Sequence, residues 1–134
     1  MYLAALSEEQ KELFLDLSIF SMRSNGIVEV REQELAYQYC DEMNIRKREN
    51  VKNTNVDDVL KQLKKISTDS EMKKITVELV ALMYADDDFA DEEDELLMKL
   101  QNTFCFSSHV MGELIFATKH LLLSHRMLAE IVRE

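Results

Sequence analysis

The chain contains no proline, no tryptophan and only two glycines in 134 residues. Sheets and long loops usually need proline and glycine at their turns, so their scarcity favours helices joined by short connections. Two cysteines without Cys-x-x-Cys spacing provide no disulfide framework and no zinc-site pattern, and they predict free, buried thiols in a reducing compartment. No uncharged run is long enough to span a bilayer, and the first residues lack the basic flank of a signal peptide. We therefore expect a soluble, cytoplasmic protein without membrane insertion.

Acidic residues outnumber basic ones, and the net charge is −10. Because the phosphates of nucleic acid bind lysine and arginine, this acidic charge argues against a nucleic-acid partner. Residues 46–74 are the exception, with nine basic side chains against five acidic ones. We interpret this segment as a solvated surface that balances the acidic ends, and contact with phosphate or an acidic partner is the alternative.

Capping residues followed by apolar residues at helical spacing predict an all-α fold, with six or seven helices in one compact bundle. Three helix starts are signalled by Ser7 with Gln10, Asn55 with Asp58, and Thr68 with Glu71. The helices after Ser7 and Thr68 are apolar on nearly every side, so we expect both at the centre of the bundle.

The region after Ser107 or Ser108 predicts one long helix or two short ones. Its apolar positions recur at helical spacing and are expected to face the core: Met111, Leu114, Ile115, Thr118, Leu121, Leu122, Leu128 and Ile131.

A helix–loop–helix phrase occurs twice in the chain at one constant offset. The first copy contains Asn25, Gly26, Val28 and Glu32, and the second contains Asp86, Asp87, Phe89 and Glu93. Flanking apolar positions also match, so the copies cover about residues 10–43 and 71–104. Such repetition indicates a duplicated unit packed against its copy. We expect a single domain over residues 1–134 with a pseudo-two-fold axis.

The composition of the repeated loop is explained in part by local folding. Asn25 and Asp86 can accept hydrogen bonds from amides in the turn, and Glu32 and Glu93 fall in the first turn of the next helix, where carboxylates are favoured. None of this requires a ligand.

The second loop is the stronger candidate site, because eight of the ten residues from 86 to 95 are acidic. Hard cations such as Ca²⁺ and Mg²⁺ prefer carboxylate oxygens, although the spacing does not match an EF-hand. The candidate ligands are Asp86, Asp88 and Glu93, with Asn25 and Glu32 in the first loop. Three interpretations stay open: a solvated helix start, a weak Ca²⁺ or Mg²⁺ site, and a docking surface for a basic protein. No other cofactor is expected.

These residues resemble the TerB-like family, which is associated with tellurite resistance. The family phrase is Ala-Asp-Gly-x-(Val/Phe)-x-x-x-Glu, and residues 85–93 are similar to it, with Asp87 in place of glycine. The first copy keeps Gly26, Val28 and Glu32 but has Asn25 where aspartate is usual. The resemblance covers roughly residues 8–105. It implies a duplicated all-helical fold, a stress-associated intracellular module and a proposed divalent-metal role for the acidic residues.

The sequence shows no glycine-rich phosphate loop and no serine–histidine–aspartate set. His120 and His125 are five positions apart and do not share a helix face, as a pair of metal ligands would. We expect a non-enzymatic interaction module, and an enzyme or metal-dependent protein that uses the clustered carboxylates is the alternative.

Overall fold

The computed structural model describes residues 1–23, 30–84 and 91–133, without the side chains of residues 31, 32 and 91–93. These residues form six α-helices and one short 3-10 helix, and contain no strand. The elements are η1 (Leu3–Ala5), α1 (Glu8–Arg23), α2 (Val30–Met43), α3 (Val56–Ile66), α4 (Asp69–Met83), α5 (Asp91–Phe104) and α6 (Ser108–Val132). The predicted all-helical fold is therefore confirmed, whereas the duplication and its symmetry stay predictions.

The predicted helix starts carry the expected caps. Ser7 Oγ accepts a hydrogen bond from the Gln10 amide at 3.2 Å, and Gln10 Oε1 accepts one from the Ser7 amide at 2.8 Å. Thr68 and Glu71 form the same reciprocal capping box before α4. Asn55 accepts from the amide three residues later at the start of α3. Each cap satisfies amides that a helix start leaves unpaired, so these boundaries are fixed locally.

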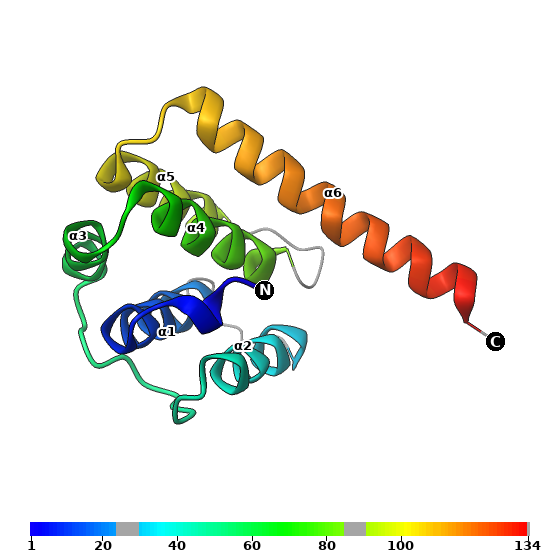
Figure 1. Ribbon diagram of the computed structural model, residues 1–134, viewed down its shortest axis with the longest axis horizontal. Coiled ribbons are helices and arrows are strands. Elements are labelled where there is room, and N and C mark those ends of the chain that lie inside the picture. The colour runs from blue at the N-terminus through cyan, green and yellow to red at the C-terminus, as the bar shows by residue number, and fades with distance from the viewer. Residues whose placement is uncertain (24–29, 85–90, 134) are drawn as a thin grey trace.

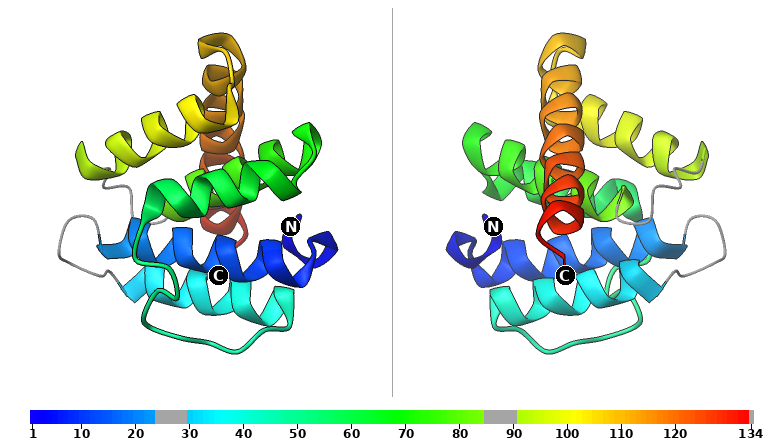
Figure 2. Two further views of the ribbon diagram at one scale, coloured as in Figure 1. Left: turned by 90° about the vertical axis from the view of Figure 1, so that its left-hand side faces the viewer. Right: turned by 90° about the vertical axis from the view of Figure 1, so that its right-hand side faces the viewer.

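Helices α1 and α4 form the centre of the molecule. Figures 1 and 2 show α2, α1 and α4 packed in that order, with α5 and α6 beyond α4 and α3 across one end. The buried apolar side chains of the two helices are Leu13, Phe14, Leu15, Leu17, Ile19 and Met22 in α1, and Met72, Ile75, Leu79, Val80, Leu82 and Met83 in α4. Two of their buried hydroxyl groups bond within the helix: Ser18 donates to the Phe14 carbonyl at 3.0 Å and Thr76 to the Met72 carbonyl at 2.8 Å.

The region after Ser107 is one continuous helix, and only its first half packs against the core. Met111 and Thr118 are buried, whereas Leu121, Leu128 and Ile131 are exposed, so the expectation that these three face the core is wrong. Leu121 lies on a side of α6 that α4 does not cover, since its neighbour Leu122 is partly buried. For Leu128 and Ile131, helix length is the reason. At 1.5 Å per residue the 25 residues of α6 span about 38 Å and the 15 residues of α4 about 22 Å, so the final turns of α6 pass the end of α4 (Figure 1).

Substitutions at two methionines test whether α6 packs against the core as described. Met111→Ala should lower the free energy of unfolding by about 2–4 kcal/mol, because it leaves a cavity under α6. Met98→Ala, at a methionine that is 58% exposed on α5, should change it by less than about 0.5 kcal/mol. Chemical denaturation of both variants measures the difference, and equal losses would mean that α6 does not pack as described.

Candidate functional site

The residues predicted to bind a cation are not brought together by anything that the structure describes. Asn25, Asp86 and Asp88 lie outside the described residues. Glu32 and Glu93 are the third residues of α2 and α5, as predicted, but their side chains also lie outside the description.

The two helices that follow the repeated loops begin on the same side of the molecule (Figure 2). Near the start of α5, the side chains of Asp94 and Glu95 are exposed to solvent. Among the side chains that the structure describes, no group of three or more histidine, cysteine, aspartate or glutamate residues could hold a metal ion. The cation hypothesis therefore rests on the sequence of the second loop alone.

An ionic network around the buried Asp16, which the sequence did not reveal, joins α1 to the segment between α2 and α3. The Asp16 carboxylate in α1 is 2% exposed, and its Oδ1 lies 2.6 Å from Arg48 Nη1. Asp16 also accepts hydrogen bonds from the amides of Lys52 at 2.9 Å and Asn53 at 3.3 Å. The guanidinium of Arg48 donates in addition to the carboxylate and the carbonyl of Glu12. Asp16 is thus fully engaged with partners inside the chain.

This network holds the long connection against α1. Lys52 adds a contact of 3.1 Å from its Nζ to the Glu12 carboxylate. Partial burial alone would raise the pKa of Glu12, but hydrogen bonds from Lys52 and Arg48 outweigh it and lower that pKa. Part of the basic segment 46–74 therefore has a structural task, while Lys61, Lys64 and Lys65 of α3 are exposed, as expected for a solvated surface.

A second pair of carboxylates, from α2 and α4, holds the amino-terminal residues. The amino group of Met1 lies 2.6 Å from Glu42 and 3.5 Å from Glu78. The Leu3 amide donates to Glu42 at 2.8 Å and the Tyr2 amide to Glu78 at 3.4 Å. These contacts attach η1 to the two helices.

The environments of these carboxylates move their pKa values in opposite directions. Burial and the neighbouring Glu42 charge raise the pKa of Glu78, despite the nearby amino group. Burial opposes the change at Glu42, but hydrogen bonds from the Met1 amino group and the Leu3 amide lower its pKa. Such a pair could exchange protons with a substrate. Here the carboxylates already accept hydrogen bonds from the chain, and anchoring η1 accounts for the arrangement.

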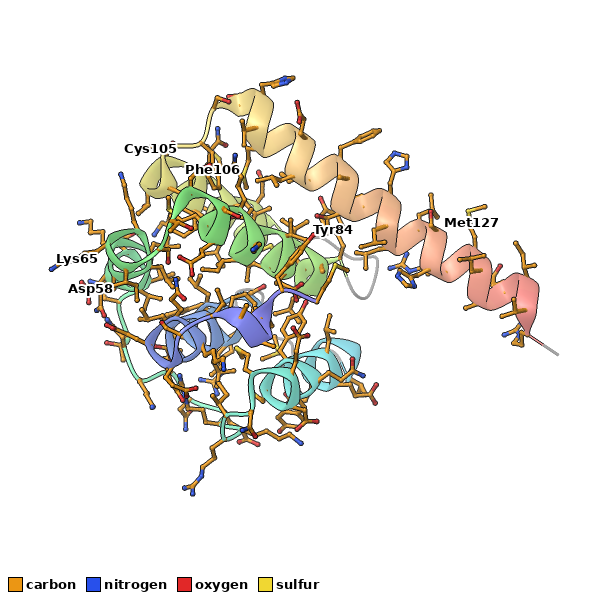
Figure 3. All side chains as sticks on the ribbon, viewed as in Figure 1. Asp58, Lys65, Tyr84, Cys105, Phe106 and Met127 are labelled. Carbon is orange, nitrogen blue, oxygen red and sulfur yellow. The ribbon has the colours of Figure 1, made fainter. Side chains whose placement is uncertain are left out.

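Both cysteines are free, as predicted, but only one of them is buried. Cys40 lines a cavity of about 250 Å³ between α1, α2 and the segment after α2, and burial raises the pKa of its thiol. The thiolate is the nucleophile of cysteine chemistry, so burial makes Cys40 less reactive. Cys105 is exposed at the end of α5 (Figure 3), contrary to the expectation. Its Sγ lies 3.1 Å from Lys64 Nζ. Its positive φ of 60° ends the helix there.

The exposed apolar side chains of α6 gather mainly in its distal half, residues 121–132. Exposed apolar side chains on this helix are Phe116, Leu121, Leu123, Met127, Leu128, Ile131 and Val132, with exposed fractions from 38% to 74%. Figure 3 shows Met127 on the part of α6 that extends away from the other helices. Arg126 donates to the Tyr84 carbonyl at 2.9 Å, so α6 contacts the residue that ends α4 at this position.

Comparison of the chain with family models, curated proteins and solved structures found no match. Within the described residues, no helix is both long enough and apolar enough to cross a membrane.

The network around Asp16 predicts that substitutions at two nearby arginines will differ in their effect on stability. Arg48→Met should lower the free energy of unfolding by about 2–4 kcal/mol, because it leaves the Asp16 carboxylate buried without its guanidinium partner. Arg46→Met, at an exposed arginine two positions earlier, should cost less than about 0.5 kcal/mol. Urea unfolding near neutral pH provides the comparison. A loss no larger for Arg48 than for Arg46 would show that the network does not stabilise the fold.

Proposed function

We propose that this chain is a non-enzymatic interaction module with a TerB-like helical fold, and that it binds a protein partner through the distal half of α6. The exposed apolar surface of that half carries the proposal. Soluble proteins rarely expose contiguous apolar patches larger than a few hundred Å², and larger ones mark binding sites.

The composition of α6 supports this proposal. From Leu121 to Ala129 the only charged side chain is Arg126, which turns toward Tyr84. Aromatic side chains and methionine are common at protein interfaces. Met127 lies in the distal half of α6, and Phe116 is exposed just before that half. A helix that presents such a face fits the mode of recognition in which one helix packs on another.

The chemistry of the described polar residues is compatible with a binding role. The buried carboxylate Asp16 is paired with Arg48, and Glu42 and Glu78 attach η1. Each group therefore has a task in folding. The stress-associated role and the cytoplasmic location follow from the TerB-like resemblance and from the composition, and they belong to the proposal.

Weak binding of Ca²⁺ or Mg²⁺ by the acidic loop is the second candidate function, favoured by the density of acidic residues from 86 to 95. Asp86, Asp88 and Glu93 would supply oxygen ligands, and Asn25 and Glu32 would do so in the other loop. A metal-dependent enzyme would have to use these same carboxylates. Calorimetric titration of the wild type and of Glu93→Gln with each ion distinguishes this alternative from the binding module.

The proposed surface can be mapped by photo-crosslinking. Benzoylphenylalanine is introduced at Met127 on α6 and, as the matched control, at Met98 on α5, where exposure is nearly equal at 54% and 58%. We expect protein adducts at position 127 and few at position 98, both in the purified protein and in extracts of the producing cells. Absence of adducts at position 127, or equal yields at the two positions, would contradict the proposal.

A further inference from the structure

One side of α6 carries a heptad pattern along almost its whole length. Its members are separated alternately by four and three positions: Val110, Leu114, Ala117, Leu121, Ser124, Leu128 and Ile131. We call these residues the α6 seam. A seam with this spacing is the side that one helix presents to another in coiled-coil packing.

The fold covers only the beginning of the α6 seam. Val110 and Leu114 are partly buried near α4, whereas Leu121, Leu128 and Ile131 are exposed. No charged residue belongs to the seam, so nothing in it opposes packing against a second apolar helix. Thr118 donates to the carbonyl four residues earlier at 2.7 Å, and Ser124 of the seam can satisfy its hydroxyl in the same way.

The sizes of the seam residues make the seam complementary to itself in one orientation. In an antiparallel pair centred between residues 122 and 123, Leu121 faces Ser124 of the second copy, and Leu128 faces Ala117. Large side chains then meet small ones, which fills the space between two helices without voids. A parallel pair would instead place leucine against leucine and leave gaps at the small residues.

A groove lies where this register places the end of the second helix. It has a volume of about 290 Å³ and lies between α4 and α6, lined by Lys73, Val77, Val110, Glu113, Leu114 and Ala117. In the antiparallel register, Leu128 and Ile131 of the second copy lie against Ala117 and Leu114, and so enter this groove beside Val77. The two-fold axis makes the contact reciprocal, with each copy filling the groove of the other.

We infer that two copies of this chain associate through an antiparallel pairing of their α6 seams, with the distal end of each α6 in the α4–α6 groove of the other copy. The inference rests on the proposed function and names its partner. Residues 114–131 span about 27 Å at 1.5 Å per residue. Specific, stable interfaces bury at least about 600 Å² per partner, and the seam and the groove together have to supply this area.

Sedimentation over a range of concentrations tests the pairing. The wild type should approach twice the 15.7 kDa mass of one chain as concentration rises. Leu128→Asp should weaken association about tenfold or more, because the two-fold axis places a charge in the interface twice. Met98→Asp is the matched control, since Met98 and Leu128 are both 58% exposed but Met98 lies on α5, outside the seam. Circular dichroism checks that each variant is folded, and Ile131→Lys replaces Leu128→Asp if that variant is not.

A disulfide experiment tests the register. Ala117→Cys and Leu128→Cys are made separately in a Cys105→Ser background, which removes the exposed native thiol. Oxidation of a mixture should give mixed disulfide dimers of the two variants, whereas either variant alone should remain largely uncrosslinked. Efficient dimer formation by Ala117→Cys alone would indicate a parallel pair and overturn the inference.

The outcomes separate this inference from the proposed function. A wild type that stays monomeric up to several hundred micromolar, or a dimer insensitive to Leu128→Asp and Ile131→Lys, overturns the pairing. If position 127 still forms adducts with a different protein, the binding role of α6 survives with another partner. If the wild type is monomeric and position 127 forms no adduct, both proposals fail.

Discussion

The architecture depends on one constraint: α1 and α4 are apolar on nearly every side and must be covered on every side. A helix with a single apolar stripe can rest on a surface, but these two have to lie inside the bundle. Each large apolar side chain that they bury contributes roughly 1.5–3 kcal/mol relative to exposure. The positions of α2, α3, α5 and the first half of α6 follow, because each covers part of this central pair (Figure 1).

The polar contacts in the interior are consequences of the same constraint. The segment from Asn44 to Asn55 must run along α1 to reach α3, and Asp16 gives its amides and Arg48 a buried acceptor. In the same way, Glu42 and Glu78 accept hydrogen bonds from the amides of η1 and of the residue before it, which holds η1 against α2 and α4. Isolated buried carboxylates would be costly, so the chain supplies a donor for each.

Local signals in the sequence predicted the helices well, because caps and apolar periodicity act within a few residues. The buried network was not predictable in this way, since Asp16 and Arg48 are 32 positions apart and no short pattern connects them. At α6 the periodicity was interpreted wrongly for a different reason. Apolar periodicity identifies side chains that need to be buried against another surface. It does not show whether that surface belongs to the same chain or to a second one. The predicted acidic ligands, or their side chains, fall outside the described residues.

The central claim is that the distal half of α6 is covered by a second copy and not by its own chain. Amide hydrogen exchange at low micromolar and at several hundred micromolar protein tests this claim most directly, because local protection reports which backbone segments become covered. The account predicts that residues 121–132 exchange more slowly at the higher concentration, while α2, which lies on the opposite side of the molecule from α6, changes little (Figure 1). Exchange in residues 121–132 that does not depend on concentration would contradict it.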